Sequence, residues 1–163
     1  MYKRQGVNPS ATWLHLTISE HGEMNSTIVI FPGTNREHDM VMAVEQASGK
    51  KPHFVWYNDK SFPKTDLIIV PGGFSYGDYL RSGAMAARSP AMNSVLEYAS
   101  KGVPILGVCN GFQILTEVGL LPGALIRNKN LKFICRNVNI KVEVNDSIFT
   151  SRYSKGQILS IPI

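Results

Sequence analysis

The sequence has few of the features that mark secreted, membrane-spanning or metal-binding proteins. Its two cysteines, Cys109 and Cys135, are too few for a disulfide scaffold and fit a reducing cytoplasm. No apolar run approaches the roughly 20 residues that a membrane helix needs. No cluster of cysteine and histidine has the spacing of zinc ligands. We therefore expect a cytoplasmic protein with no membrane segment and no bound metal.

The composition is that of a folded domain. Apolar residues make up 44% of the 163 residues and charged residues 18%, which excludes a disordered chain and allows a substantial core. Residues 1–23 have neither a helical nor a strand period, and we interpret them as a loose N-terminal extension. The domain is expected over residues 24–163.

The net charge of +5 comes from one segment of the chain. Residues 127–155 hold seven basic side chains against Glu143 and Asp146. The segment is either a solvated strand-and-loop region or a docking face for a phosphorylated substrate or an acidic partner. It has few aromatic residues and no recognition motif, which argues against nucleic-acid binding. The basic residues are Arg127, Lys129, Lys132, Arg136, Lys141, Arg152 and Lys155.

Short apolar runs alternate with helical patterns through the first three quarters of the chain. Apolar runs of this kind are typical of strands buried on both faces, so the pattern predicts an α/β fold with a doubly wound, mostly parallel sheet. The predicted strands cover 27–31, 53–57, 66–70 and 104–108. The predicted helices lie between the capping residues Asn35 and Gly49, between Ser89 and Gly102, and over 110–117.

The pattern changes after Pro122. Apolar and polar residues alternate over part of 133–144, which predicts a half-exposed, antiparallel strand, and a further strand begins at 157–161. Cys135 lies in the first of these strands without neighbouring glycines, and we interpret it as a buried structural cysteine.

The strongest chemical signal is the sequence Gly-Val-Cys-Asn-Gly-Phe-Gln at 107–113. A cysteine between two glycines, directly after a buried strand and before a helix, is typical of a nucleophile elbow. The helix N-terminus favours a thiolate at Cys109, and the backbone N–H of Asn110 is placed to donate to an oxyanion. The alternative is a buried cysteine whose glycine neighbours serve packing, and the strand–turn–helix context makes it the weaker interpretation.

A second glycine-rich loop, residues 71–79, follows the predicted strand 66–70 at the same edge of the sheet. Glycines after a strand expose backbone N–H groups that can bind an anion. We expect Gly72, Gly73 and Phe74 to border the site, with the second oxyanion donor coming from Gly73 or Phe74.

A general base for the thiol is not evident in the sequence. All four histidines precede Cys109, and they are His15, His21, His38 and His53. His38 lies at the same sheet edge as the elbow, but a histidine in a first helical turn is more often a simple exposed residue. The mechanism therefore lacks an obvious proton acceptor.

These motifs resemble those of the class I (triad) glutamine amidotransferases, which share a flavodoxin-like fold. More narrowly, the chain is similar to the glutaminase subunits of phosphoribosylformylglycinamidine synthase. The resemblance covers about residues 24–163 and is specific, because the glycine loop and the elbow are distinctive together. It rests on the segments 29–35, 71–81, 107–121, 127–128 and 133–137.

The resemblance implies a defined chemistry. Cys109 would attack the side-chain amide of glutamine and release ammonia, and the γ-glutamyl thioester would be hydrolysed to glutamate. The backbone at Gly73 and Asn110 would stabilise the oxyanion, and Gln113 would help to hold the glutamine.

The resemblance also implies partners. The ammonia would pass to a large synthetase subunit that binds ATP, Mg²⁺ and formylglycinamide ribonucleotide, and a small third subunit would complete the complex. This chain has no Walker motif, so we expect no ATP site and no cofactor on it.

One departure from the family pattern matters for activity. Family members carry the triad histidine and glutamate shortly after a segment similar to residues 158–163, where this sequence stops. We therefore expect the chain to be incomplete at its C-terminus and to have no efficient glutaminase activity by itself. Two alternatives stay open: a docking subunit with a vestigial site, and a DJ-1/PfpI-type cysteine hydrolase, although the loop 74–78 and Gln113 argue against the second.

Overall fold

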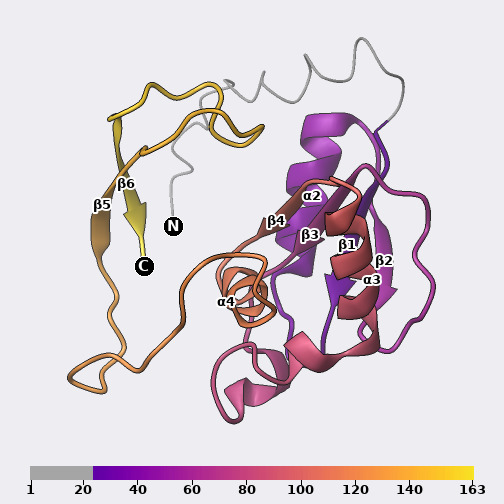
Figure 1. The fold of residues 1–163 in the computed structure, drawn as a ribbon, viewed down its shortest axis with the longest axis horizontal. Helices are drawn as coiled ribbons and strands as arrows, with labels where there is room; N and C mark the ends of the chain where they lie inside the picture. Colours follow the sequence, from indigo (N-terminus) through magenta and orange to yellow (C-terminus); the bar gives the residue numbers. More distant parts are fainter. Residues whose placement is uncertain (1–23) are drawn as a thin grey trace, which may run out of the picture. The chain divides into compact units, whose positions relative to one another are not determined.

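The computed structural model describes residues 24–163, which fall into two compact units that divide after Leu125. The expected extension over 1–23 lies outside the described residues. In the first unit, four parallel strands form one sheet in the order β2-β1-β3-β4 (Figure 1). The parallel sheet predicted from the apolar runs is confirmed. The strands are β1 (Ser26–Ile30), β2 (His53–Trp56), β3 (Leu67–Val70) and β4 (Ile105–Gly107).

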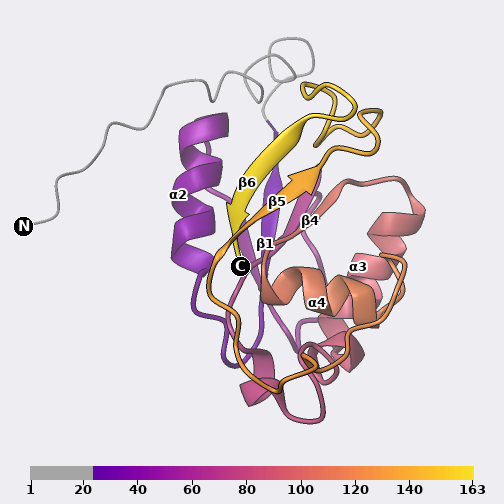
Figure 2. The same cartoon turned by 90° about the vertical axis from the view of Figure 1, so that its left-hand side faces the viewer.

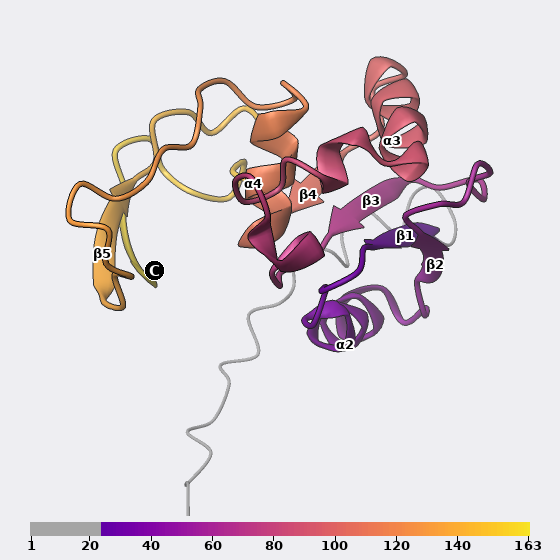
Figure 3. The same ribbon diagram turned by 90° about the horizontal axis from the view of Figure 1, so that it is seen from below.

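Helices cover both faces of this sheet. Helix α2 (Glu37–Ser48) lies on one face, and helices α3 (Pro90–Ser100) and α4 (Asn110–Glu117) lie on the other (Figure 3). Successive side chains of a strand point to opposite faces, so the central strands bury apolar groups on both sides. A hydrophobic core lies under α3 and α4, and it includes Val29, Phe31, Ile68, Val70, Ala91, Met92, Val95 and Ile114. The doubly wound architecture is thereby confirmed.

The helix termini follow the sequence signals with one exception. Gly49 ends α2 with φ of 72°, and Ser89 with Pro90 begins α3, as predicted. The predicted cap at Asn35 is wrong, because α2 begins at Glu37 with Arg36 in the N-cap position. Asn35 instead belongs to a contact between loops, where its backbone N–H donates to the carbonyl of Gly72 over 3.3 Å.

The strand order determines where a site can form. Strands β1 and β3 are neighbours, and the chain leaves them in opposite directions to build the two halves of the sheet. In such sheets ligands bind at the carboxyl ends of the strands, at this switch point. The loops that follow β1, β3 and β4 begin at this edge, and they carry Gly33, Gly73 and Cys109.

The second unit, residues 126–163, contains an antiparallel pair of strands, β5 (Asn137–Lys141) and β6 (Ile158–Pro162) (Figure 2). The antiparallel pairing is as predicted, but the strand predicted over 133–144 is too long. Phe133 is 89% exposed, and Cys135 is exposed, so its interpretation as a buried cysteine is wrong. Both precede β5, and within this unit a two-stranded ribbon offers no second layer to cover them.

The described residues include no helix that is long and apolar enough to cross a membrane.

Substitutions on helix α3 test which of its faces contributes to the free energy of unfolding. Met92 is fully buried against the sheet, whereas Leu96 on the same helix is 36% exposed. We expect Met92→Ala to lower the free energy of unfolding by about 2–5 kcal/mol, and Leu96→Ala by about 1 kcal/mol or less. Urea denaturation of the two variants measures both values. Equal losses would contradict the placement of α3.

Candidate functional site

The polypeptide turns sharply at Cys109, between β4 and α4. Cys109 is exposed and has φ of 53° and ψ of −112°, a conformation that costs a non-glycine residue about 1–3 kcal/mol. The flanking glycines make the turn possible. A Cβ on Gly111 would lie 1.8 Å from the carbonyl oxygen of Val70, and one on Gly107 would lie 2.7 Å from Leu115 Cδ1. The strained elbow therefore requires glycine on both sides of the cysteine.

The glycine loop after β3 packs against this elbow on one side and against the loop after β1 on the other. A Cβ on Gly72 would lie 3.2 Å from Cys109 Cβ, so the thiol-bearing side chain rests on the bare backbone of this glycine. Gly73 has φ of 147°, and a Cβ there would lie 2.6 Å from the carbonyl oxygen of Gly33. The loops that follow β1 and β3 can thus meet beside Cys109 only because Gly73 has no side chain.

The candidate oxyanion donors can be compared through their hydrogen bonds. The N–H of Phe74 donates to the carbonyl of Gly33 over 3.1 Å, so it is already engaged. The N–H groups of Gly73 and Asn110 have no hydrogen-bond partner among residues 24–163. Asn110 begins α4, where the first N–H groups lack helical acceptors. The sequence allowed either Gly73 or Phe74 as the second oxyanion donor. Of these two, only Gly73 has an N–H that is available to bind an oxyanion.

The side chain of Asn110 joins the elbow to the glycine loop. Its Oδ1 accepts from the N–H of Ser75 over 3.0 Å, and its Nδ2 donates to Gln113 Oε1 over 2.8 Å. Asn110 is only 2% exposed, so this bridge is shielded from water. The sequence predicts only a backbone role for Asn110, because no local pattern links its side chain to Ser75.

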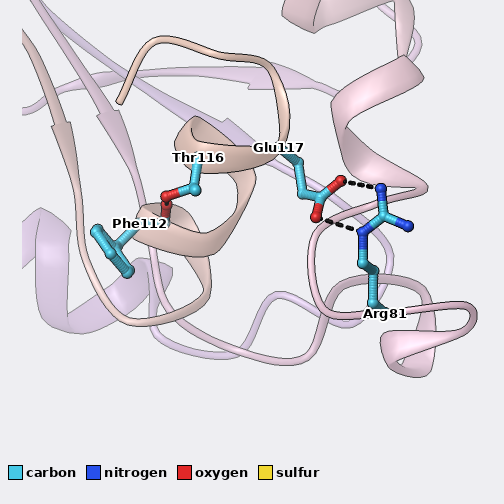
Figure 4. A network of polar contacts seen from close by, with 4 residues as sticks. All are labelled: Arg81, Phe112, Thr116 and Glu117. Atoms are coloured by element: carbon cyan, nitrogen blue, oxygen red, sulfur yellow. Dashed lines mark hydrogen bonds and ion pairs between the residues drawn. The ribbon is translucent and has the colours of Figure 1, made fainter. Parts of the chain in front are cut away.

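A second bridge joins α4 to the segment that continues from the glycine loop, at the C-terminal end of the helix. The guanidinium of Arg81 donates to both carboxylate oxygens of Glu117, with Nε–Oε1 and Nη2–Oε2 distances of 2.6 and 2.7 Å (Figure 4). The hydrogen bonds from Arg81, followed by its charge, lower the pKa of Glu117. The last turn of α4 is also tied by Thr116, whose hydroxyl donates to the carbonyl of Phe112 over 2.9 Å.

Other ionisable groups of the loop have pKa values that are shifted by burial. Burial raises the pKa of Tyr76, which stacks edge-on against Tyr57 at 5.8 Å. Burial also raises the pKa of Asp78, and a hydrogen bond with Ser82 partly opposes this shift.

Among residues 24–163, the structure does not bring a histidine to the cysteine. His38 is exposed in the first turn of α2, and His53 begins β2, at the end of the sheet away from the elbow. No hydrogen bond joins either of them to Cys109 in the part of the chain that the structure describes. That part also contains no group of three or more potential metal ligands.

Residues 23–163 match the family model of the CobB/CobQ-like glutamine amidotransferase domain. The chain belongs to this family. The structure of PurLQS from Thermotoga maritima contains a similar fold, with a TM-score of 0.78 and 45% sequence identity. The match covers 86% of this chain and 66% of that one. The family resemblance read from the elbow and the glycine loop is confirmed.

Curated relatives of this amidotransferase domain carry a narrower name. Subunit PurQ of phosphoribosylformylglycinamidine synthase from Rhodospirillum rubrum is 57% identical over 141 residues, which cover 86% of this chain and 61% of the relative. The corresponding subunit from Novosphingobium aromaticivorans is 56% identical over 139 residues, covering 85% and 62%. The chain thus spans about three fifths of the length of the curated relatives it matches.

The Arg81–Glu117 pair of the amidotransferase domain predicts a pH-dependent stability. Because the pKa of Glu117 is lowered in the folded chain, the pair stabilises the fold above the unfolded carboxyl pKa of about 4.3. That stabilisation is lost as the pH falls through the lowered value. We expect Glu117→Gln to reduce the free energy of unfolding at pH 7, and the difference from wild type to shrink as the pH is lowered toward 3.

Urea denaturation across this pH range measures the effect, and Glu97→Gln is the matched control. Glu97 pairs with Lys101 on α3, where both side chains are more than half exposed, so little change is expected at any pH. A loss in Glu117→Gln that stays constant with pH would contradict the assignment.

Proposed function

We propose that the chain carries the glutamine-hydrolysing site of phosphoribosylformylglycinamidine synthase. The observation that carries the proposal is the exposed Cys109 on its strained elbow, beside two backbone N–H groups that have no hydrogen-bond partner within residues 24–163. A thiolate with two nearby donors is the arrangement that acyl transfer requires. The curated relatives bear the name of this synthase, which supports glutamine as the amide substrate.

The proposed reaction proceeds through a thioester. The Cys109 thiolate attacks the side-chain carbonyl carbon of glutamine, and the oxygen gains a negative charge that the N–H groups of Gly73 and Asn110 stabilise. The carbon–nitrogen bond then breaks, and the nitrogen takes a proton from water and leaves as ammonia; the hydroxide formed is neutralised by the proton that the thioester hydrolysis releases. Water hydrolyses the γ-glutamyl thioester to glutamate and restores the thiol.

The residues around Cys109 have separate tasks in this scheme. Gly72 and Phe74 shape the loop that brings Gly73 to the cysteine, and Gln113 contributes its amide to the glutamine contact. Since Gln113 Oε1 is held by Asn110, its amide plane has a fixed orientation toward the elbow. No histidine follows His53 in the sequence, so we assign the nucleophile and the oxyanion donors to this chain but no base.

The ammonia has to reach an acceptor before it escapes to water. We propose that a large synthetase subunit, which binds ATP, Mg²⁺ and formylglycinamide ribonucleotide, receives it, with a small third subunit completing the complex. One solved structure similar to this chain is that of PurLQS, which supports such an assembly. The proposed chemistry needs Cys109 as a free thiol, which supports a reducing compartment such as the cytoplasm as its location.

The second unit offers a surface for this partner. All seven basic residues of 127–155 are exposed, and five residues of the segment line a hollow of about 340 Å³. We propose that this basic surface contacts the synthetase. The lining residues are Arg127, Asn128, Leu131, Lys132 and Phe133.

A substitution of the nucleophile separates the enzyme from a vestigial docking subunit. In the complex with its synthetase partner, we expect Cys109→Ser to abolish whatever glutamine-dependent amidine formation the unsubstituted chain supports, and to leave ammonia-dependent formation intact. Cys135→Ser, which changes the other exposed cysteine, is the control and is expected to preserve both activities. Glutamine-dependent turnover that survives Cys109→Ser would contradict the proposed function.

The basic surface is tested by charge reversal. Arg127→Glu and Arg136→Glu are expected to weaken the association with the synthetase while leaving the free energy of unfolding unchanged, because both side chains are exposed. Lys64→Glu, an exposed cation of the first unit, is the control. Titration calorimetry measures the affinity. Unchanged affinity in both arginine variants would remove this surface from the proposal.

A further inference from the structure

The loop between β3 and α3 has a conformation that its own residues disfavour. Tyr76, Asp78 and Leu80 all have positive φ, at 53°, 56° and 68°, although none of them is glycine. Such conformations are costly for residues with a Cβ, and they persist only where surrounding contacts impose them. This loop begins at the glycines beside Cys109, so whatever holds it also holds the N–H of Gly73.

Two polar bridges attach the loop to α4, one near each end of the helix. Asn110, the first residue of α4, accepts from Ser75, and Glu117, the last residue, binds Arg81. The two attachment points are seven positions apart in the sequence, which is about 10 Å along a helix. Between them, Gly83 approaches the helix backbone so closely that a Cβ would lie 2.9 Å from the N of Ile114. The loop is thus fastened along α4 rather than at one point.

The position of Glu117 is not explained by helix stability. A carboxylate at the C-terminal end of a helix faces the negative end of the helix dipole, which is unfavourable. Its side chain is only 10% exposed, whereas that of Arg81 is 62% exposed, so the loop supplies the cation that the covered carboxylate needs. The guanidinium meets both carboxylate oxygens, and this geometry fixes direction as well as distance.

We propose that Arg81 and Glu117 are positioning residues that hold the free N–H of Gly73 at the correct separation from the N–H of Asn110. The proposal rests on the proposed function. When the pair is broken, the strained loop relaxes, and the oxyanion loses one donor although Cys109 itself is untouched. A misplacement of about 1 Å in such a site can lower the rate by about a hundredfold.

The experiment compares two reactions of Cys109 in the same chain. In the first, the thiolate attacks the carbonyl of L-glutamic acid γ-p-nitrophenyl ester. The ester carbon–oxygen bond breaks, p-nitrophenolate leaves, and a γ-glutamyl thioester forms, so a burst of colour reports one acylation. In the second, the thiolate displaces iodide from iodoacetamide, a step that forms no oxyanion. The ratio of the two rate constants reports the oxyanion donors separately from the reactivity of the thiol.

We expect Arg81→Ala to lower the acylation rate constant by about ten- to a hundredfold while alkylation stays within about twofold of wild type. The acylation rate constant of Arg81→Lys is expected to lie between those of wild type and Arg81→Ala, because an ammonium cannot reproduce the two-point contact of the guanidinium. Glu117→Gln, which keeps the size of the side chain, is expected to resemble Arg81→Ala. Lys101→Ala, which breaks the exposed ion pair on α3, is the control and is expected to leave the ratio unchanged.

The outcomes separate the two proposals. If wild type shows the burst and Cys109→Ala does not, but the Arg81 and Glu117 variants keep the wild-type ratio, the positioning role is wrong and the proposed function stands. If acylation and alkylation fall together, the pair acts on general folding or on the thiol, which also overturns the positioning role. If wild type gives no Cys109-dependent burst, the proposed function fails, and the inference fails with it.

Discussion

The site depends on the absence of a side chain at Gly111. With no Cβ there, the first turn of α4 lies directly against the carbonyl of Val70, at the end of β3. This contact brings the carboxyl ends of the neighbouring strands β4 and β3 into one layer. Any larger residue would push α4 away from the sheet, and Cys109 would lose both its strained backbone and its proximity to the glycine loop.

Hydrogen bonds and one ion pair then fix the glycine loop in place beside Cys109. Backbone contacts with the loop after β1 hold the glycine loop on one side, and Asn110 holds it on the other. The ion pair between Arg81 and Glu117 attaches the loop to the C-terminal end of α4 as well. These contacts offset the unfavourable backbone conformation of the loop. They leave the N–H of Gly73 without a hydrogen-bond partner among residues 24–163.

The general architecture could be predicted from the sequence because it follows from local patterns. Continuous apolar runs indicated buried parallel strands, and glycines on either side of Cys109 indicated the elbow. These signals depend on residues close together in the chain, so they survive without knowledge of the tertiary structure. They were sufficient for the family, the sheet and the edge at which the site forms.

What could not be predicted depends on contacts between distant residues. Ser75 and Asn110 are 35 residues apart, and Arg81 and Glu117 are 36 apart, so no spacing rule links them. The wrong cap at Asn35 has the same origin, since a loop from another strand takes its backbone. Cys135 was misplaced for a different reason: alternation predicts a face to be buried, but within residues 126–163 no second layer covers it.

The central claim is that the oxyanion lies between the N–H groups of Gly73 and Asn110. A crystal structure of the chain after reaction with 6-diazo-5-oxo-L-norleucine tests it most directly, because the ketone oxygen of the Cys109 adduct occupies the place of the oxyanion. The account predicts hydrogen bonds of about 2.7–3.1 Å from both N–H groups to that oxygen. A ketone oxygen that points away from Gly73, with its N–H still unpaired, would contradict the account.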